Sequence, residues 1–333
     1  MSAGAAPAVV VRAPNWLGDT VMAQPALAAL RAGAPDATIT VVGRWASVLR
    51  GQGMADALLD YPGDGGRGRF ARALAGARPD VALILPNSFE AARAARRWRA
   101  RRRVGFDTDA RGPLLTDRVP LPEPRRHQVD EYRLLVEALG MPALAVEPRL
   151  RPPCEPALEA EGDTLLAGAV SAGVPRVGLH LGAAGGPAKR WAVAAWAELA
   201  ERLIHGGLAP LLLGGPGDIA TADAVLRLAG RAPASLVGRD RPALLPHLLT
   251  RLQCLVSADT GVAHLAAALG TATVTLFGST DPRLSAPRSS RALVVAPGAP
   301  CAPCFLAECP IEHPCMRAIT AEAVGARVRA AVA

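Results

Sequence analysis

Aromatic residues are scarce in this chain. Of its 333 residues only 4% are aromatic, namely 5 Phe, 5 Trp and 2 Tyr. Proteins that bind single-stranded nucleic acid stack the bases on aromatic side chains, and this sequence has too few for such a platform. It also contains no nucleic-acid-binding motif. We therefore expect no nucleic-acid partner, although the net charge is +8.

Long apolar runs are missing too. No run reaches the roughly 18–20 residues that a helix needs to span a bilayer. The opening residues, MSAGAAPAVVVRAPN, place no basic segment before their apolar run, so we expect no signal peptide. These two features together predict a cytoplasmic protein.

Several catalytic motifs are absent as well. The sequence has no G-x-x-x-x-G-K-[ST] order, which argues against a P-loop and ATP hydrolysis. It also has no H-E-x-x-H motif and no Ser/His/Asp order of a hydrolase. A pair of catalytic carboxylates of the glycosidase type cannot be identified from the sequence alone.

The residues that are present predict an α/β protein. Half are apolar, mostly Ala, Leu and Val, and the length suggests two domains. Strand-like and helix-like segments alternate over 8–106 and again over 176–277, including one helix over 20–32. The segment 107–126 is rich in Pro, Asp and Arg and is expected to be a loop. This alternation predicts two domains with parallel sheets that face a cleft.

A proline-rich segment, 142–156, interrupts the alternation and is interpreted as the linker. The predicted first domain is 1–150 and the second is 157–318. The remaining residues, 319–333, contain an amphipathic helix that could cross back to the first domain.

The stretch from Val256 to Pro282 carries the clearest local signal. A short apolar strand ends in Ser-Ala-Asp-Thr-Gly, and a helix follows. Asp259 or Thr260 suits the N-cap, Gly261 permits close approach of a ligand, and His264 lies one turn further on. Ligands of open α/β sheets bind at the carboxyl ends of strands, and a helix N-terminus suits phosphate. The alternative is an ordinary capped helix with a packed histidine.

Two other turns have the same character. In the turn from Gly182 to Trp191, glycines admit an anion to the backbone, and Lys189 and Arg190 add positive charge. The alternative is a glycine-rich turn with two solvated cations. Asp19 lies where the first strand meets its helix, which suits a general base that faces the cleft, or a simple N-cap.

Arginines and cysteines each form a cluster. The segment 93–103, RAARRWRARRR, indicates an anionic partner or a solvated helix face. Near the end of the chain, four cysteines with the spacing C-x2-C-x4-C-x5-C suggest a structural zinc site or free thiols in a reducing compartment. These cysteines are Cys301, Cys304, Cys309 and Cys315.

Five motifs in order resemble the ADP-heptose:lipopolysaccharide heptosyltransferases, glycosyltransferase family 9, and most of all its heptosyltransferase II branch. They cover nearly the whole chain, and each is weak alone. The matching residues are Pro14-Asn-Trp-Leu-Gly-Asp, Leu85-Pro-Asn-Ser-Phe, Gly186-Pro-Ala-Lys-Arg-Trp, Ser257-Ala-Asp-Thr-Gly-Val-Ala-His and Leu276-Phe-Gly-Ser-Thr-Asp-Pro.

The resemblance implies a GT-B fold, that is, two Rossmann-like domains with the active site between them. It implies inverting, metal-independent transfer of L-glycero-D-manno-heptose from ADP-heptose to heptose I of the lipopolysaccharide inner core. Asp19 matches the proposed base, Lys189 matches the residue that holds the donor phosphates, and Asp218 loosely matches an acidic residue on the ribose. The donor-binding residues implied are Gly185, Gly186, Lys189, Arg190, Asp218, Asp259, Thr260, Gly261 and His264. The acceptor-side residues implied are Asn15, Trp16, Asn87, Ser88 and Arg103.

The resemblance also implies partners: ADP-heptose, and an acceptor linked to Kdo and lipid A at the inner face of the inner membrane, where the protein could bind peripherally. No cofactor is expected for catalysis. Asp107-Thr-Asp has the letters of a metal motif, but it falls in the predicted loop and is interpreted as incidental. The alternatives are heptosyltransferase I or a later-core member of the family, and a non-catalytic nucleotide- or polyanion-binding protein.

Overall fold

A computed structural model describes residues 6–62, 66–142, 145–152 and 154–333. Residues 143–144 and 153 of the predicted linker lie outside the described residues. The chain forms two compact units, one up to Leu150 and one from Arg151. Within the described residues, no helix is long and apolar enough to cross a membrane.

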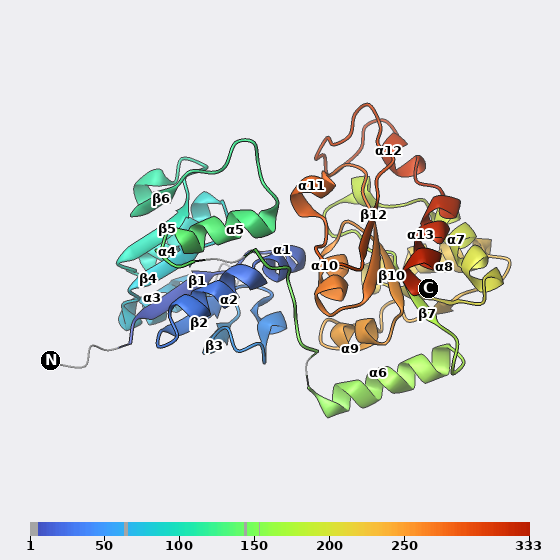
Figure 1. The fold of residues 1–333 in the computed structure, drawn as a ribbon, viewed down its shortest axis with the longest axis horizontal. Coiled ribbons are helices and arrows are strands. Elements are labelled where there is room, and N and C mark those ends of the chain that lie inside the picture. The colour runs from blue at the N-terminus through green and yellow to red at the C-terminus, as the bar shows by residue number, and fades with distance from the viewer. Residues whose placement is uncertain (1–5, 63–65, 143–144, 153) are drawn as a thin grey trace. The chain divides into compact units, whose positions relative to one another are not determined.

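The first unit is a six-stranded sheet in the order β3-β2-β1-β4-β5-β6, and every neighbouring pair is parallel (Figure 1). Short apolar runs rich in Val and Ile build its central strands, and their side chains are almost completely buried. The strands are β1 (Ala8–Arg12), β2 (Thr38–Val42), β3 (Ala57–Leu59), β4 (Val81–Ile84), β5 (Arg102–Phe106) and β6 (Asp117–Val119).

Helices cover both faces of this sheet. One group packs together as α1 (Leu17–Met22), α2 (Gln24–Gly33) and α5 (Gln128–Glu137). The other pair is α3 (Arg67–Ala77) and α4 (Phe89–Arg97), which share a core of small residues around Trp98. Two 3-10 turns complete the unit, η1 (Ala46–Leu49) and η2 (Gly112–Leu114).

The second unit repeats the plan with the strand order β12-β11-β10-β7-β8-β9, again all parallel. Central β10 and β11 are buried along their whole length. The strands are β7 (Arg176–His180), β8 (Ala209–Leu213), β9 (Ala234–Ser235), β10 (Cys254–Ala258), β11 (Ala272–Leu276) and β12 (Ala292–Val295).

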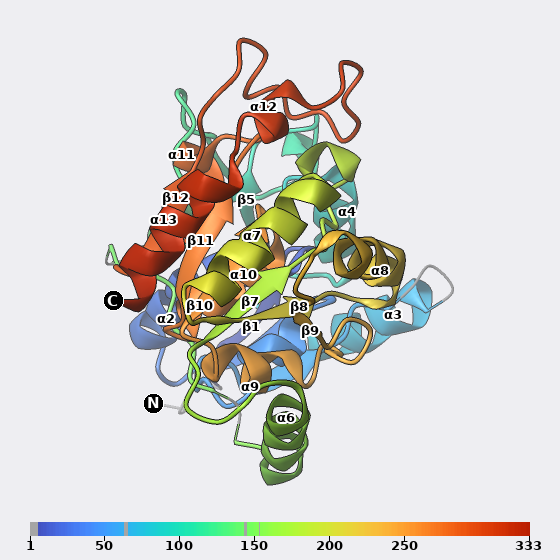
Figure 2. The same cartoon turned by 90° about the vertical axis from the view of Figure 1, so that its right-hand side faces the viewer.

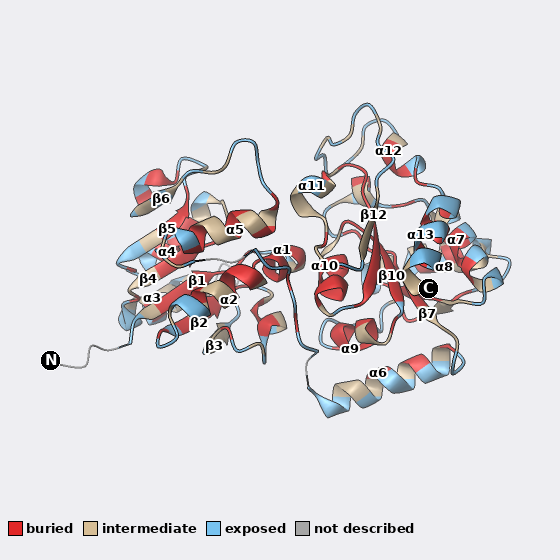
Figure 3. Cartoon of the chain, in the orientation of Figure 1, coloured by how far each residue is buried: buried red, intermediate tan, exposed pale blue. Residues whose placement is uncertain are grey.

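The helices of the second unit also form two layers. Figure 2 shows α7 (Val193–His205), α8 (Ile219–Leu228) and α13 (Ala321–Val332) side by side in front of the sheet. On the other face, α9 (Leu245–Thr250) contacts α6 (Pro156–Ala169) and α10 (Gly261–Ala268), and α10 is almost entirely buried (Figure 3). The short pieces are η3 (Pro187–Lys189), η4 (Pro216–Asp218), α11 (Pro282–Ser285) and α12 (Pro314–Arg317).

The predicted α/β class with two parallel sheets is confirmed, and two local predictions need correction. The helix expected over 20–32 is two helices, because Ala23 ends α1 and Pro25 occupies the first turn of α2. The loop expected over 107–126 contains η2 and the edge strand β6. The C-terminal helix α13 packs on α7 and β11 of the second unit, with Val324 and Val328 in that core.

Candidate active site

The functional side chains of the second unit follow two adjacent strands, β7 and β10. These strands are paired with Ser257 opposite His180, so the turns after them emerge at one edge of the sheet. From there the chain continues to β8 on one side and to β11 on the other. This is the topological switch point at which open α/β sheets bind ligands. The fold therefore brings the predicted 182–191 and 259–264 segments together.

Lys189 and Asp259 meet at this switch point. Lys189 Nζ lies 2.6 Å from Asp259 Oδ2, and Thr280 donates a hydrogen bond of 2.8 Å to the same oxygen. The Lys189 side chain is 20% exposed and that of Asp259 is 8% exposed. Lys189 is the single lysine of the chain, beside 36 arginines. The site thus holds one compact cation that is partly open to solvent and fixed by a buried carboxylate.

The N-terminus of α10 adjoins this pair. Thr260 is the N-cap residue, but its side chain does not cap the helix, and its hydroxyl lies 2.9 Å from that of Ser257. The predicted alternative cap, Asp259, is engaged with Lys189 and Thr280 instead. The first N–H groups of α10, from Gly261 onward, therefore have no side-chain cap and suit an anion. His264 is buried one turn further on.

Gly185 and Gly186, beside Lys189, meet different structural constraints. The Lys189 side chain lies back over Gly185, where an added Cβ would be 3.3 Å from its Cε. Gly186 has a φ of 117° and an added Cβ would approach the carbonyl oxygen of Ala307 to 2.5 Å. That carbonyl accepts a hydrogen bond of 2.9 Å from the Ala188 N–H. Arg190, by contrast, is exposed, and its N–H donates to the carbonyl of Pro187 at 3.0 Å.

The cysteine-rich segment, residues 301–315, thus ties together the turns at Gly186 and Ser279. Ala307 holds the turn at Gly186, and the Phe305 N–H donates to the carbonyl of Ser279, at 2.7 Å. All six cysteines of the chain lie in the described residues, and none forms a disulfide. Across the described part of the chain, no group of three or more His, Cys, Asp or Glu residues is arranged to hold a metal ion. The predicted zinc site therefore stays a prediction.

A second polar cluster lies at the ends of β7 and β8. The Asp218 carboxylate accepts from the Gly215 N–H at 3.1 Å and lies close to Gly182 and Gly214. Asp240 accepts from the Gly214 N–H at 2.8 Å, and burial raises the pKa of Asp240 to about 7. Burial also lowers the pKa of His180 to about 4. The Asp218 carboxylate can accept hydrogen bonds from a ligand hydroxyl, whereas Asp240 holds the Gly214 turn through its hydrogen bond.

In the first unit, a pocket of about 220 Å³ forms at the carboxyl ends of β1 and β4. This is the switch point of that sheet, because β1 leads to β2 on one side and β4 to β5 on the other. Asp19, in the first turn of α1, is half-buried there. The pKa of Tyr132 is raised well above its usual value, mainly by burial and also by the Asp19 charge nearby. The lining residues include Asn15, Trp16, Asp19, Asn87, Ser88, Gln128 and Tyr132.

Two buried arginines that the sequence analysis missed support this pocket. Arg12 donates to Asn15 Oδ1 at 2.7 Å and to the carbonyl of Ala13. Arg111 donates to the carbonyls of Pro86, Ser88 and Phe106, and burial lowers its pKa to about 10. Each guanidinium thus fixes one of the two loops of the pocket. The position of Arg12 inside an apolar strand run was the only signal, because arginine is common throughout this chain.

The family-model match covers residues 67–314 and describes glycosyltransferase family 9 (heptosyltransferase). The chain belongs to glycosyltransferase family 9. It is 30% identical over 311 residues to lipopolysaccharide heptosyltransferase 2 of Salmonella typhimurium, covering 86% of this chain and 87% of that protein. The solved structure of E. coli ADP-heptose LPS heptosyltransferase II is 26% identical, covers 97% of this chain and 98% of that one, and has a TM-score of 0.81.

A heptosyltransferase 1, from Pseudomonas aeruginosa, matches at 35% identity but over only 122 residues, 36% of this chain and 34% of that protein. The predicted resemblance to family 9 is confirmed, as is the GT-B fold. As a family 9 member the chain is a glycosyltransferase, a heptosyltransferase of lipopolysaccharide core synthesis.

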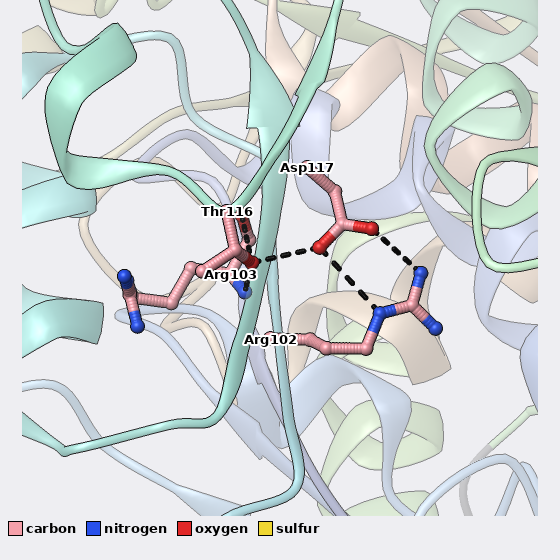
Figure 4. A network of polar contacts seen from close by, with 4 residues as sticks. All are labelled: Arg102, Arg103, Thr116 and Asp117. Atoms are coloured by element: carbon pink, nitrogen blue, oxygen red, sulfur yellow. Dashed lines mark hydrogen bonds and ion pairs between the residues drawn. The ribbon is translucent and has the colours of Figure 1, made fainter.

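One acceptor-side residue predicted from the family 9 resemblance lies elsewhere. Arg103, on β5, donates to the carbonyls of Leu114 and Ala100 at 2.7 and 2.8 Å and is not among the residues that line the pocket. Its neighbour Arg102 pairs with Asp117 at 2.7 Å, and Thr116 joins the same network between β5 and β6 (Figure 4). Both arginines therefore hold the edge of the first sheet together.

Proposed function

We propose that the chain transfers L-glycero-D-manno-heptose from ADP-heptose to heptose I of the lipopolysaccharide inner core, with inversion and without a metal. The observation that carries this proposal is the Lys189–Asp259 pair beside the uncapped N-terminus of α10. A diphosphate leaving group needs fixed positive charge, and an ammonium with helix N–H groups supplies it. The second unit therefore binds the donor.

The transfer step assigns a role to each unit. The acceptor hydroxyl oxygen attacks the anomeric carbon of the heptose while the bond from that carbon to the diphosphate oxygen breaks, and ADP leaves. The hydroxyl proton passes to the Asp19 carboxylate, which acts as general base. Asp19 suits this role because it lines a pocket in the first unit with several hydrogen-bonding groups, Asn15, Asn87 and Ser88 among them. The negative charge that develops on the diphosphate is stabilised by Lys189.

We further propose that Asp218 binds the donor ribose. Its carboxylate lies beside Gly182 and Gly214, which carry no side chains, so that two hydroxyl groups of a ribose could donate to it. Arg190 is proposed to approach the donor phosphates from the exposed side of the same turn.

The choice of acceptor is supported by the relatives. A protein named lipopolysaccharide heptosyltransferase 2 matches along 86% of this chain, whereas the heptosyltransferase 1 match spans 36%. We therefore favour an acceptor that already carries the first heptose on Kdo and lipid A, used at the cytoplasmic face of the inner membrane. The same donor with a different acceptor, as in heptosyltransferase I or a later-core enzyme, is the alternative.

Incubation of the purified chain with ADP-heptose and a delipidated inner-core acceptor tests the reaction. We expect release of ADP, addition of one heptose and an anomeric configuration opposite to that of the donor. Turnover should persist in EDTA, since Lys189 supplies the charge on the leaving group. Retention of the donor configuration, or loss of turnover in EDTA that magnesium restores, contradicts the proposed mechanism. Binding of ADP-heptose without any transfer would instead favour a non-catalytic binding protein.

A further inference from the structure

Helix α4 of the first unit has two chemically opposite sides. Its buried side consists of alanines, Ala91, Ala92, Ala94 and Ala95. Its outer side carries Phe89, Arg93, Arg96 and Arg97, all exposed. The spacing i, i+4, i+7 and i+8 places these four on one stripe of the helix. Helix α4 therefore presents an arginine stripe that begins with an exposed aromatic ring.

Helix α3 extends this stripe into a surface. It lies beside α4 on the same side of the sheet, where Phe70 of α3 makes edge contacts with Tyr61 and Trp98, at ring separations of 6.0 and 6.5 Å. Its exposed residues include Arg69 and Arg72. We define the arginine face as Arg69, Arg72, Arg93, Arg96 and Arg97. Within the described residues, none of these five side chains makes an ion pair or hydrogen bond.

The charge of the arginine face is not compensated nearby. Residues 66–106 contain eleven arginines and two carboxylates, Asp80 and Glu90. Glu90 accepts from the Tyr61 hydroxyl at 2.5 Å and lies 3.9 Å from Arg67, and Asp80 pairs with Arg101. Residues 1–150 hold 21 arginines and 15 carboxylates, so +6 of the net +8 belongs to this unit. Such self-repulsion is a cost to folding, which points to an external anionic partner.

We propose that the arginine face binds the surface of an anionic lipid bilayer. Two neighbouring helices with outward arginines form an extended surface, as a lipid headgroup layer requires, and clustered basic residues bind anionic lipids. Exposed aromatic rings flank it: Phe89 is 47% exposed and Trp16, at the pocket, is 56% exposed. Aromatic rings of this kind favour the membrane interface. Nucleic acid is the less suitable partner, because a stacking platform needs several aromatic side chains and the exposed Phe89 is the single one on this stripe of α4.

The arginine face lies next to the Asp19 pocket, and its role there rests on the proposed function. Ser88 caps α4 through the Ala91 N–H and also lines the Asp19 pocket, and Phe89 is the next residue. The arginine stripe therefore starts at the edge of the pocket. A protein anchored through this face would keep its acceptor pocket close to sugars that are attached to a membrane lipid.

Vesicle co-sedimentation of the full chain tests the inference. Vesicles of phosphatidylcholine with about 30–40% phosphatidylglycerol should bind the protein at low salt and release it as salt is raised. Vesicles of phosphatidylcholine alone should not. The triple variant R93Q/R96Q/R97Q should lose roughly 100-fold in affinity for the anionic vesicles, since each basic residue near such a surface contributes to binding. R93K/R96K/R97K should bind like the parent, because the attraction depends on charge.

A matched control changes three exposed arginines of the second unit, R227Q/R231Q/R327Q, and should bind vesicles like the parent protein despite the same net charge change. ADP binding and the melting temperature verify that each variant is folded. Unchanged vesicle binding in R93Q/R96Q/R97Q, or equal binding to neutral vesicles, overturns the proposal. Tighter binding to duplex DNA than to anionic vesicles at equal salt also overturns it. With a delipidated acceptor the variant should keep the parent kcat, so a failed transfer reaction and a failed membrane contact are distinguishable.

Discussion

Lys189 Nζ lies 2.6 Å from Asp259 Oδ2 and joins the turns after β7 and β10 of the second sheet. The pair gives the turn a fixed cation before any anion arrives, because Asp259 is itself anchored by the Thr280 hydroxyl. An incoming diphosphate can share the ammonium with Asp259, since the amine has three donor directions. The pair is thus a preorganised part of the proposed donor site.

Replacing Lys189 should weaken ADP binding and lower turnover. Loss of a charged hydrogen bond is worth about 1.5–3 kcal/mol, so Lys189→Ala should reduce ADP affinity roughly 10- to 100-fold. Lys189→Arg should not restore it, because the planar guanidinium does not fit the point contact over Gly185. Calorimetric titration with ADP measures both. Arg190→Ala is the comparison, and its effect should be smaller, because Arg190 is exposed.

The single lysine permits an independent check of this prediction. An amine-selective acylating reagent has only Lys189 and the N-terminal amine as targets in this chain. ADP should slow modification of Lys189 and leave the N-terminal amine unaffected, as read by peptide mass spectrometry. Equal labelling of Lys189 with and without saturating ADP would place the donor phosphates elsewhere.

Asp19→Asn should abolish turnover and spare ADP affinity, because Asp19 belongs to the first unit and the proposed donor site to the second. Removing a general base typically costs 10²- to 10⁴-fold in rate. Steady-state release of ADP and calorimetry separate the two effects. Asp36→Asn, at an exposed turn of the same unit, is the control and should be silent. Near-parental turnover of Asp19→Asn would refute the assignment of the base.

Asp240 should make stability fall as pH rises. Its folded pKa of about 7 exceeds the ordinary 3.8, so the folded protein keeps a proton that the unfolded chain releases between about pH 4 and pH 7. Asp240 therefore costs stability across that window, and the full cost applies above it. Asp240→Asn retains an acceptor for the Gly214 N–H and removes the charge.

Asp240→Asn should accordingly raise the melting temperature at pH 8 and change it little at pH 4. A gain of about 1–2 kcal/mol is expected at pH 8, given about 1.4 kcal/mol per pKa unit and partial access of water. Calorimetric melting over pH 4–8 measures it, and the exposed Asp223→Asn on α8 provides the control. A gain that is the same at pH 4 and pH 8 would exclude ionisation of Asp240 as its cause.

Zinc binding by the cysteine-rich segment remains a prediction, and it would affect the turns that this segment contacts. If zinc binds, it should stiffen residues 305–307, which hold the turn at Gly186 and the carbonyl of Ser279. Tag-free protein should then contain about one zinc per chain, and the double variant C301S/C304S should lose it and bind ADP more weakly. Cys154→Ser, a cysteine outside the segment, should retain the metal. If the protein contains no metal and binds ADP with the parental affinity, the zinc prediction is wrong, and the hydrogen bonds of residues 305–307 alone hold the segment in place.

The strands and helices that position the site were predicted from the sequence more accurately than the side-chain contacts within the site. Strand β2, helix α7 and strand β8 lie within the ranges 8–106 and 176–277 over which alternating strands and helices were predicted, because each is a single apolar run with clear boundaries. The end of β10 and the turn to α10 were likewise predicted from Asp259-Thr-Gly. What spacing alone did not show was that Lys189 and Asp259 are partners, since they are 70 residues apart in the chain.

The roles of the arginines were the least predictable part. In the run 93–103 every arginine looks alike, but Arg93, Arg96 and Arg97 point outward from α4, whereas Arg102 and Arg103 hold β5 to its neighbours. Arg12 and Arg111 are buried because backbone carbonyls receive their guanidinium groups. Burial of a charge depends on tertiary partners, which local sequence does not specify. The edge strand β6 was missed for a related reason, because its Asp117 and Arg118 have no apolar pattern.

The central claim is the identity of the acceptor, and a two-acceptor assay tests it most directly. The purified chain is incubated with ADP-heptose and, separately, with a Kdo-lipid A acceptor that lacks heptose and with one that carries the first heptose. Mass spectrometry of the products records the addition. We predict that one heptose is added to the heptose-bearing acceptor alone. Addition only to the heptose-free acceptor would contradict the account.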